Sequence, residues 1–364
     1  MLMMLDGHAQ TRARELARLE FVIDSAGNAY TSKSNTHAIT LGIIEGSITQ
    51  AYSFGTIDPA DDRLATAQTV FEIGPISQTI TATLLAEFAH KGYLDLDGYL
   101  LDYLPDSLVQ NRALEGITLK HLANHTSGLP RLPTNFAHPD SLNANNPYPE
   151  FPLDPIQEYS AADLYEYLEN FPGSSYMPGA EYSPSDLGYA IIGVILTEIS
   201  GKTFEELLSE SFCQPLGLEN TGSIPYEDQD YAMSHLLSGE MILPGTYNAL
   251  AGSLGIKSSL RDLLLYVRAH FVLREADVEH ALSMTRQFTY YIPPETDLGL
   301  GWSMNLQQEH LVFSYNGDAN GSSTYLAFAP DGRKAVVILS NSAEPVGDAG
   351  DAILEALLNV KPSR

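Results

Sequence analysis

The segment FEIGPISQT at residues 71–79 has the layout of a site for nucleophilic catalysis. It reads as a strand end, a tight turn at Gly74 and the start of a helix, where many folds place a nucleophile. Here the first helical residue is Pro75, which has no nucleophilic group, and one turn later Gln78 cannot act as a base. The nearest hydroxyl, on Ser77, points about 200° round the helix from Pro75. We therefore expect Ser77 to be structural.

Two histidines, His121 and His125, have the i, i+4 spacing of metal ligands on a helix. No third ligand is evident, so a structural role is the better interpretation, and we expect neither a metal nor a cofactor. Cys213 is the only cysteine, so no intrachain disulfide can form. It follows Phe212 in an apolar run, which favours a buried, inert thiol.

The composition is that of a globular protein with a sizeable core. Of its 364 residues, 44% are hydrophobic and 18% are charged. The formal net charge of −27 argues against nucleic acid or an anionic membrane as partner, because both bind basic surfaces. The N-terminal segment does not have the charge order of a signal peptide, and no stretch approaches the length of a membrane span. We expect a cytoplasmic protein; its oligomeric state stays open.

Strand patterns lie at both ends of the chain, and helical patterns lie between them. Residues 6–20 look like an amphipathic helix, and residues 36–58 look like two strands that turn at Glu45-Gly46. Three further strand patterns fall between residues 310 and 342, and a last helix covers about 346–359. This order predicts an α/β fold of the α+β type, in which an antiparallel sheet from both chain ends is flanked by terminal helices.

A mostly helical region is expected to be inserted into this sheet region. The predicted organisation is an N-terminal helix (1–20), a sheet region with the C-terminal helix (21–84 and 300–364) and a helical region (85–299). We expect them to form one joined unit with a cleft between the regions.

Several phrases occur together in an order and spacing typical of one family. They are HLANHTSGLP (121–130), DLGYAIIGVILTEISGKTFEELL (186–208), PLGLENT (215–221), LGLGWS (298–303) and AVVILSNSA (335–343). The chain resembles the serine β-lactamase and penicillin-binding protein family, in particular its branch of class C β-lactamases, D-alanyl-D-alanine peptidases and related esterases. The resemblance covers roughly residues 30–360 and implies a β-lactamase-like fold.

The family works with three motifs, and the resemblance implies where each one falls. The serine of Ser-x-x-Lys falls on Pro75 and its lysine on Gln78. The Tyr-x-Asn motif falls on Pro184-Ser185-Asp186. The His-x-Gly or Lys-x-Gly motif of the edge strand falls on Tyr315-Asn316-Gly317, where only the glycine matches the pattern.

These replacements remove what acyl-enzyme chemistry needs, namely a nucleophile, a base and an oxyanion hole. Pro75 also lacks the backbone N–H that, by the resemblance, the nucleophile contributes to the oxyanion hole. Pro184 cannot replace a phenol, and Gln78 carries no charge. Relative to the family, the cleft loses a cation, and we expect Asp186 and Asp318 to add anions.

Tyr315 and Asp186 are the candidate catalytic residues of the altered cleft. By the resemblance Tyr315 projects into it, where a phenol can donate a hydrogen bond or act as acid or base, unless it only fills space. Asp186 is a base, a cation anchor or, as favoured here, the N-cap of the next helix. The sequence does not decide whether the lone Trp302 lines the cleft. The other candidate cleft or ligand-binding residues are Pro75, Gln78, Pro184, Asn316, Gly317, Asp318, Tyr247 and Asn248.

Three functions fit these observations. The first is a repurposed enzyme that performs non-covalent chemistry on a small molecule, such as isomerisation, cyclisation, elimination or proton transfer. The second is a pseudoenzyme that binds a ligand or partner, and the third is a residual esterase or hydrolase with an unforeseen nucleophile. An open cleft in which Tyr315 and Asp186 face each other favours the first function, and a collapsed cleft favours the second.

Overall fold

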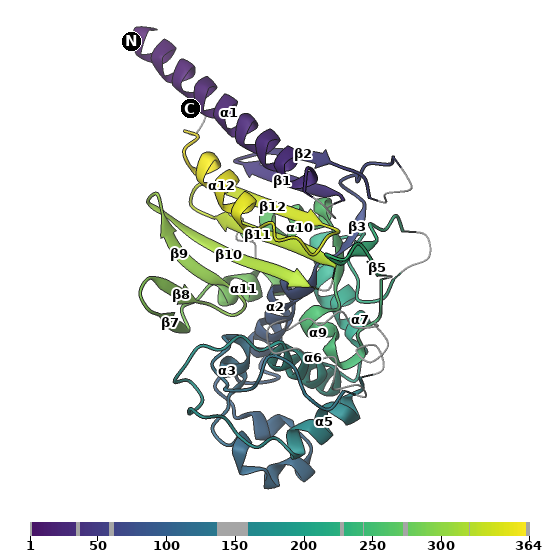
Figure 1. The fold of residues 1–364 in the computed structure, drawn as a ribbon. Helices are drawn as coiled ribbons and strands as arrows, with labels where there is room; N and C mark the ends of the chain where they lie inside the picture. The colour runs from purple at the N-terminus through teal and green to yellow at the C-terminus, as the bar shows by residue number, and fades with distance from the viewer. Residues whose placement is uncertain are drawn as a thin grey trace.

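A computed structural model describes residues 2–33, 37–57, 62–136, 159–225, 229–242, 244–271, 276–319 and 321–361. Within them, the chain forms an eight-stranded antiparallel sheet of order β2-β1-β12-β11-β10-β9-β8-β7 (Figure 1). Its strands are β1 (Ile39–Glu45), β2 (Ile48–Phe54), β7 (Tyr290–Ile292), β8 (Thr296–Leu298), β9 (Ser303–Gln307), β10 (His310–Ala319), β11 (Ser322–Ala329) and β12 (Lys334–Ser340).

The two ends of the chain meet in this sheet, as the strand patterns predicted. β1 pairs antiparallel with β12, so that Ile39 lies opposite Ser340 and Glu45 lies opposite Lys334. β1 and β2 form the expected hairpin, and Gly46 in its turn has a φ of 62°, which a glycine adopts at little cost. The fold class inferred from the sequence is therefore confirmed.

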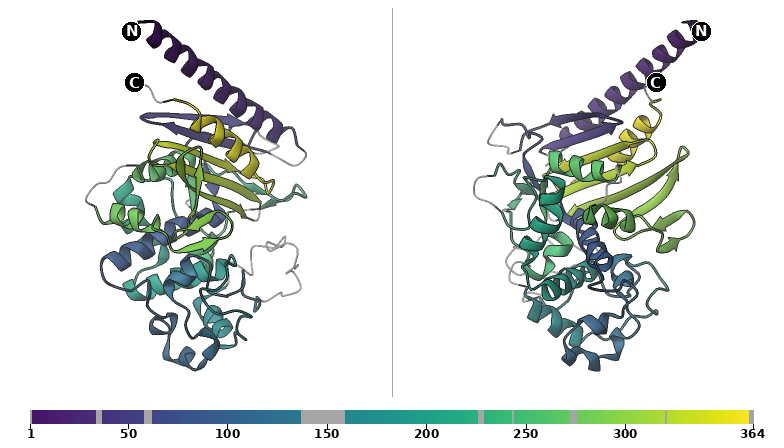
Figure 2. Two further views of the ribbon diagram at one scale, coloured as in Figure 1. Left: turned by 90° about the vertical axis from the view of Figure 1, so that its left-hand side faces the viewer. Right: turned by 180° about the vertical axis from the view of Figure 1, so that it is seen from behind.

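Two terminal helices, α1 (Leu2–Thr31) and α12 (Gly347–Leu358), pack together on one face of the sheet. α1 is longer at both ends than the predicted helix at residues 6–20. Its later turns stay helical because Ile23 and Tyr30 are buried against the sheet, where the Tyr30 hydroxyl bonds to Ser340 at 2.7 Å. Both views in Figure 2 show the N-terminal end of α1 extending beyond the rest of the chain.

The other face of the sheet carries the main core. α2 (Ser77–His90), α10 (Leu260–Ala269) and α11 (Asp277–Thr285) contribute to it. α2 is central, because every residue from Ser77 to Phe88 is buried. Trp302 also belongs to this core rather than to a site surface: it is 1% exposed and its ring centroid lies 5.1 Å from that of Phe328.

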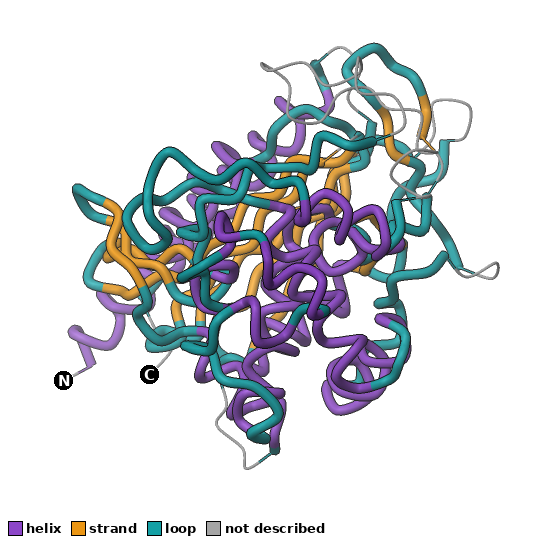
Figure 3. The backbone as a smooth tube through the Cα atoms, turned by 90° about the horizontal axis from the view of Figure 1, so that it is seen from below, coloured by secondary structure: helices purple, strands orange, loops and turns teal. Residues whose placement is uncertain are grey.

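The helical region lies below the sheet in Figure 1 and in front of it in Figure 3. Its elements are α3 (Leu119–Ala123), α5 (Ala161–Glu169), α6 (Asp186–Ser200), α7 (Phe204–Leu207), the π-helix η6 (Leu208–Cys213), α8 (Gln214–Leu216) and α9 (Ala251–Leu254). Short 3-10 helices are η1 (Gly74–Ile76), η2 (Leu100–Tyr103), η3 (Asp106–Gln110), η4 (Arg112–Leu114) and η7 (Asn248–Leu250).

Two small two-stranded sheets complete the described elements. They pair β3 (Val70–Glu72) with β6 (Lys257–Ser259) and β4 (Ser234–His235) with β5 (Met241–Ile242). Of the described helices, none alone is long and apolar enough to cross a membrane, although Asp186–Ser200 and Phe204–Leu216, bent by 83°, pass that test as a pair. Cys213 is buried, as expected from its apolar surroundings.

Candidate functional site

The turn from β3 into α2 has the geometry that the sequence predicted. Gly74 has a φ of 49°, and a Cβ at this position would lie 2.6 Å from the Cβ of Ala319 on β10. Pro75 lies buried in η1, and α2 begins at Ser77. The Ser77 hydroxyl accepts a hydrogen bond from the backbone N–H of Ile256 at 3.1 Å, which is the structural role expected of it.

Gln78 lies at the centre of the site. Its Nε2 donates to Asp186 Oδ1 at 2.6 Å and more weakly to Ser253 Oγ at 3.4 Å. Its Oε1 accepts a hydrogen bond from the Tyr315 hydroxyl at 2.5 Å. Gln78 thus lies between Tyr315 and Asp186 and bonds to both, so the two candidate catalytic residues do not face each other across an open space.

Asp186 anchors a cation and does not cap the helix. Ser185 is the N-cap of α6, because its hydroxyl accepts the Gly188 N–H at 3.1 Å, and Asp186 is the first helical residue. Asp186 Oδ2 instead accepts from Nε of Arg131 at 3.2 Å. The Asp186 side chain is only 4% exposed and that of Arg131 is 38% exposed. The favoured interpretation of Asp186 as a cap is therefore wrong.

His125 also contacts this group of residues. Its Nδ1 accepts the Ser185 N–H at 3.1 Å, so in the neutral ring the proton is on Nε2. Burial, together with the nearby Arg131 charge, lowers the pKa of His125 to about 4, which keeps the ring neutral at pH 7. Nε2 lies 3.5 Å from the Tyr315 hydroxyl oxygen, at the limit of a hydrogen bond.

These contacts form one directed chain. The Tyr315 hydroxyl accepts a hydrogen bond from His125 Nε2–H and donates one to Gln78. Gln78 in turn donates a hydrogen bond to Asp186, which also accepts one from Arg131. We call these five residues the Gln78 network. The sequence reasoning missed Arg131, and it weighed His125 as a metal ligand or a structural residue, with the structural role preferred, but did not connect it to Tyr315. The family-like phrase HTSGLP around His125 was the available signal.

His121 and His125 have different structural roles. His121 Nδ1 accepts the Thr118 N–H at 3.2 Å in the capping box of α3, whereas His125 lies beyond the end of that helix. In the part of the chain that the structure describes, no three His, Cys, Asp or Glu side chains gather in a way that could hold a metal ion.

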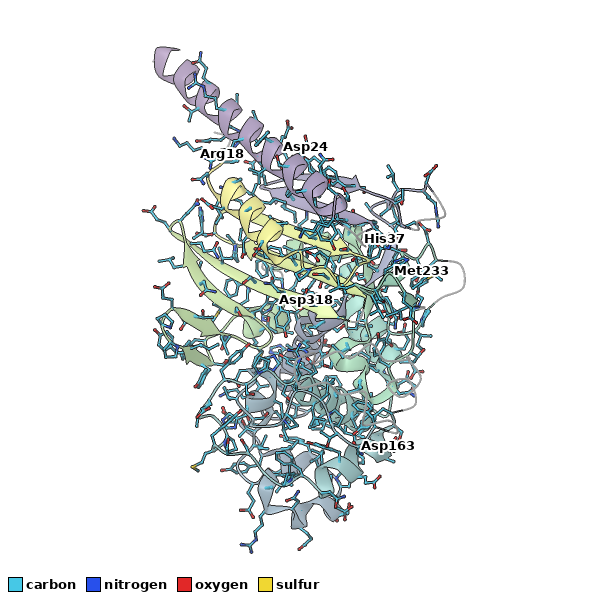
Figure 4. All side chains as sticks on the ribbon, in the orientation of Figure 1. Arg18, Asp24, His37, Asp163, Met233 and Asp318 are labelled. Atoms are coloured by element: carbon cyan, nitrogen blue, oxygen red, sulfur yellow. The ribbon has the colours of Figure 1, made fainter. Side chains whose placement is uncertain are left out.

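The side chains of Asn316 and Asp318 lie on the opposite face of the sheet from Tyr315, because neighbouring strand residues alternate in direction. Asp318 accepts a hydrogen bond from the Ser323 hydroxyl at 2.6 Å, near the start of α12 (Figure 4). A Cβ on Gly347 of α12 would lie 3.3 Å from the Asn316 amide nitrogen. The Asp318 carboxylate therefore does not add the anion that we expected beside Tyr315.

Tyr247 and Asn248 also lie outside the Gln78 network. The buried Tyr247 hydroxyl is 3.4 Å from a carboxylate oxygen of Glu72, and Nζ of Lys257 lies 5.0 Å from the ring centroid. Burial raises the pKa of Glu72 and lowers that of Lys257 to about 8, so this is a separate buried charge cluster. Asn248 lines a pocket behind α9, and Pro184 is exposed.

Gly317 keeps β10 close to η1, and this gives a first prediction. A Cβ at Gly317 would lie 2.6 Å from Thr324 Oγ1, 3.2 Å from the Ile76 nitrogen and 3.3 Å from the Ile73 oxygen. We expect Gly317→Ala to lower stability by about 1–3 kcal/mol through this crowding. Chemical denaturation followed by circular dichroism measures the change, with Ala162→Ser at an exposed position of α5 as control. A Gly317→Ala protein as stable as wild type contradicts the close packing.

Comparisons with known proteins agree with this architecture. The family model described as Beta-lactamase matches residues 35–360, so the chain belongs to the β-lactamase family, in the branch of class C enzymes and D-alanyl-D-alanine carboxypeptidases. It is 24% identical to a β-lactamase of Pseudomonas fluorescens, over 92% of this chain and 98% of that protein. It is 28% identical to the D-alanyl-D-alanine-carboxypeptidase/endopeptidase AmpH of Escherichia coli K12, over 85% of this chain and 80% of that protein.

A solved structure shows the same fold. The β-lactamase/D-alanine carboxypeptidase from Pseudomonas syringae superposes with a TM-score of 0.79 at 23% sequence identity, covering 95% of this chain and all of that one. At this identity the likeness concerns the fold alone.

Proposed function

We propose that this β-lactamase-family protein forms no acyl-enzyme and binds a small molecule at the Gln78 network without covalent chemistry. The observation that carries the proposal is the position of Gln78, which hydrogen-bonds to Tyr315 at 2.5 Å and to Asp186 at 2.6 Å. By the resemblance, this position belongs to the catalytic lysine. A neutral amide there links two polar side chains but can neither take nor supply a proton at ordinary pH.

The rest of the network also supports binding over acid–base catalysis. Asp186 is 4% exposed and already accepts hydrogen bonds from Gln78 and Arg131, which makes it a poor base. The Tyr315 proton is directed at Gln78 and not toward solvent. Pro75 supplies neither a nucleophile nor a backbone N–H. The names of relatives point to β-lactams and D-alanyl peptides as the molecules that such a site handles, and we infer a small-molecule ligand on that basis.

A second candidate is non-covalent catalysis, and one observation favours it. Tyr315 is half-buried, whereas Gln78, Asp186 and His125 are buried, so of the groups that could transfer a proton its phenol is the one that is partly exposed. A substrate that displaces Gln78 from the Tyr315 hydroxyl would receive its proton, and His125 Nε2–H would then stabilise the oxygen. Isomerisation or elimination would follow from such a transfer.

Intact-mass spectrometry tests the loss of acyl transfer. We expect no mass increase when the protein is incubated with benzylpenicillin or p-nitrophenyl acetate. We also expect no turnover by Pro75→Ser, because this variant restores a hydroxyl and an N–H but neither the lysine nor the phenol. An adduct of the mass of the acyl group, or β-lactam hydrolysis by Pro75→Ser, would sink the proposal.

Metabolite profiling separates binding from catalysis. A cell extract is incubated with the wild type and with a folded Tyr315→Phe, Asp186→Asn double variant, and both small-molecule pools are compared. We expect a compound that co-purifies with the wild type alone. Conversion of a metabolite by the wild type alone would instead establish the second candidate, and its mass change would name the reaction class.

A further inference from the structure

One pocket lies among the helices of the helical region, and none of the five residues of the Gln78 network lines it. It has a volume of about 620 Å³, within the range of small-molecule sites. Parts of α5, α6, α7, η7 and α9 surround it, and the four α-helices lie in the same region of Figure 1. The residues that line it include Ala161, Gly193, Val194, Glu198, Phe204 and Gly252.

The floor of this pocket is apolar and closely packed. α6 and α9 touch at two glycines, where a Cβ on Gly193 would lie 3.3 Å from the Cα of Gly252. Val194 and Phe204 are 7% and 8% exposed and form part of the wall. A ligand in this space therefore contacts mostly carbon, which favours an apolar body.

The charges around the pocket are predominantly negative. Glu198 accepts a hydrogen bond from the Tyr165 hydroxyl, and it forms no ion pair with any residue that the structure describes. Lys202, the cation at the pocket, is already paired with Glu210. Asp163 and Glu206 are the acidic partners of Ser160 and Thr203 in the capping boxes of α5 and α7. The hydrogen bonds in these boxes lower the pKa of both carboxyls, so both are ionised at neutral pH.

The ends of the helices add to the negative potential at the pocket. α6 ends at Ser200, and its C-terminal turn lines the pocket through Glu198 and Gly201, so its dipole presents negative charge there. The opposing N-termini of α5 and α7 are neutralised by their own capping carboxylates. The net charge of −27 adds a long-range attraction for cations.

We propose that this pocket is a second ligand site, which takes a small organic cation: an ammonium group beside the Glu198 carboxylate, on an apolar or aromatic body in the pocket floor. The proposal goes beyond the function inferred for the Gln78 network. The two sites share α9 as a wall, since Gly252 lines the pocket and its carbonyl accepts the Thr81 hydroxyl of α2 at 2.6 Å. The next residue, Ser253, accepts a hydrogen bond from Gln78.

Titration with phenethylammonium, followed by calorimetry and protein NMR, tests the proposal. We expect saturable binding in the millimolar range or tighter, with shifts centred on α5, α6 and α9. The neutral phenethyl alcohol should bind about tenfold more weakly, because it lacks the charge-assisted contact. Equal affinity for the alcohol, or no saturation by the ammonium compound, would overturn the cation site.

Matched variants locate the site. Glu198→Gln should weaken phenethylammonium binding about tenfold and leave the alcohol unaffected, whereas Glu169→Gln removes an exposed carboxylate of α5 outside the pocket and should change nothing. Ala161→Phe should fill the pocket and abolish binding of both compounds. Tyr315→Phe should retain binding, which separates this site from the Gln78 network. Unchanged affinity in Glu198→Gln and Ala161→Phe contradicts the assignment.

Discussion

Asp186→Ala is expected to destabilise the protein by about 2–3 kcal/mol. The substitution leaves the Gln78 Nε2 without its 2.6 Å acceptor in a site where Gln78 is 1% exposed. It also removes the carboxylate that pairs with Arg131. Removing one partner of a fully buried ion pair lowers stability by more than the value expected here. Arg131 is 38% exposed and keeps part of its hydration, which makes the expected loss of stability smaller. Urea denaturation followed by circular dichroism measures the change.

The controls distinguish the network from a general effect of lost charge. Asp102→Ala removes an exposed carboxylate and should shift stability by less than about 0.5 kcal/mol. Asp186→Asn keeps the shape and one acceptor for Gln78 but presents no charge to Arg131, so it should fall between wild type and Asp186→Ala. An Asp186→Ala protein as stable as Asp102→Ala would show that the Gln78 network does not hold the fold together.

A large effect at Asp186 bears on function as well as on stability. A carboxylate that serves as a base needs free lone pairs, whereas the Asp186 carboxylate accepts hydrogen bonds from Gln78 of α2 and from Arg131 and so ties α6 to both. The chain contains groups of the types that proton transfer requires, yet in the structure they bond to one another. By the resemblance, these contacts lie at the positions where the family has its reacting groups.

Five of the eight strands of the sheet, those at the two ends of the chain, follow from local sequence patterns, whereas β7, β8 and β9 were not predicted. The period-2 strands at both ends and the turn at Gly46 are readable without a structure. The same alternation would have placed Asn316 and Asp318 on the far face from Tyr315, but the motif match drew attention to neighbouring residues as one group. A sequence motif specifies the spacing of residues along the chain. The face of the sheet to which each side chain points is set by the alternation of residues along the strand.

Other features of the site depend on contacts between distant segments. Whether Ser185 or Asp186 caps α6 is a matter of one residue, and helix boundaries are uncertain at that scale. Arg131 and Asp186 are 55 residues apart in the sequence, and Tyr315 and Gln78 are 237 residues apart. Neither pairing has a local signature. The burial of Tyr247 and Trp302 likewise follows from tertiary packing, which residue type alone does not determine.

Acidification is expected to destabilise the protein through two buried histidines. His125 is 6% exposed, and its pKa is lowered to about 4 by burial and by Arg131. The unfolded chain has an ordinary histidine pKa near 6.5 and so binds more protons than the folded protein below that pH. The stabilising contribution is complete above about pH 6.5 and is lost as the pH falls toward 4, by about 3 kcal/mol in total.

His270 adds a contribution of the same sign. Burial and the nearby Arg286 hold its pKa well below 6.5, and neither ring nitrogen has a hydrogen-bond partner among the described residues. Its ring packs 4.5 Å from Phe328 and 5.5 Å from Trp302, measured between centroids. An apolar side chain of similar volume therefore suits the site better. We expect His270→Leu to stabilise the protein by about 1 kcal/mol at pH 7 and to gain further on wild type as the pH falls.

The difference between the two stability curves is the decisive quantity, because other groups titrate in the same range. Glu72 and Asp262 have pKa values raised by burial, so their contributions oppose those of the histidines in both proteins and cancel in the difference. Urea denaturation from pH 7.5 to 5 should show the gap between His270→Leu and wild type widening as the pH falls. NMR of the imidazole C–H groups should show that His125 does not titrate above pH 5. A constant gap would mean that His270 accepts a proton in the folded state, which its apolar surroundings oppose.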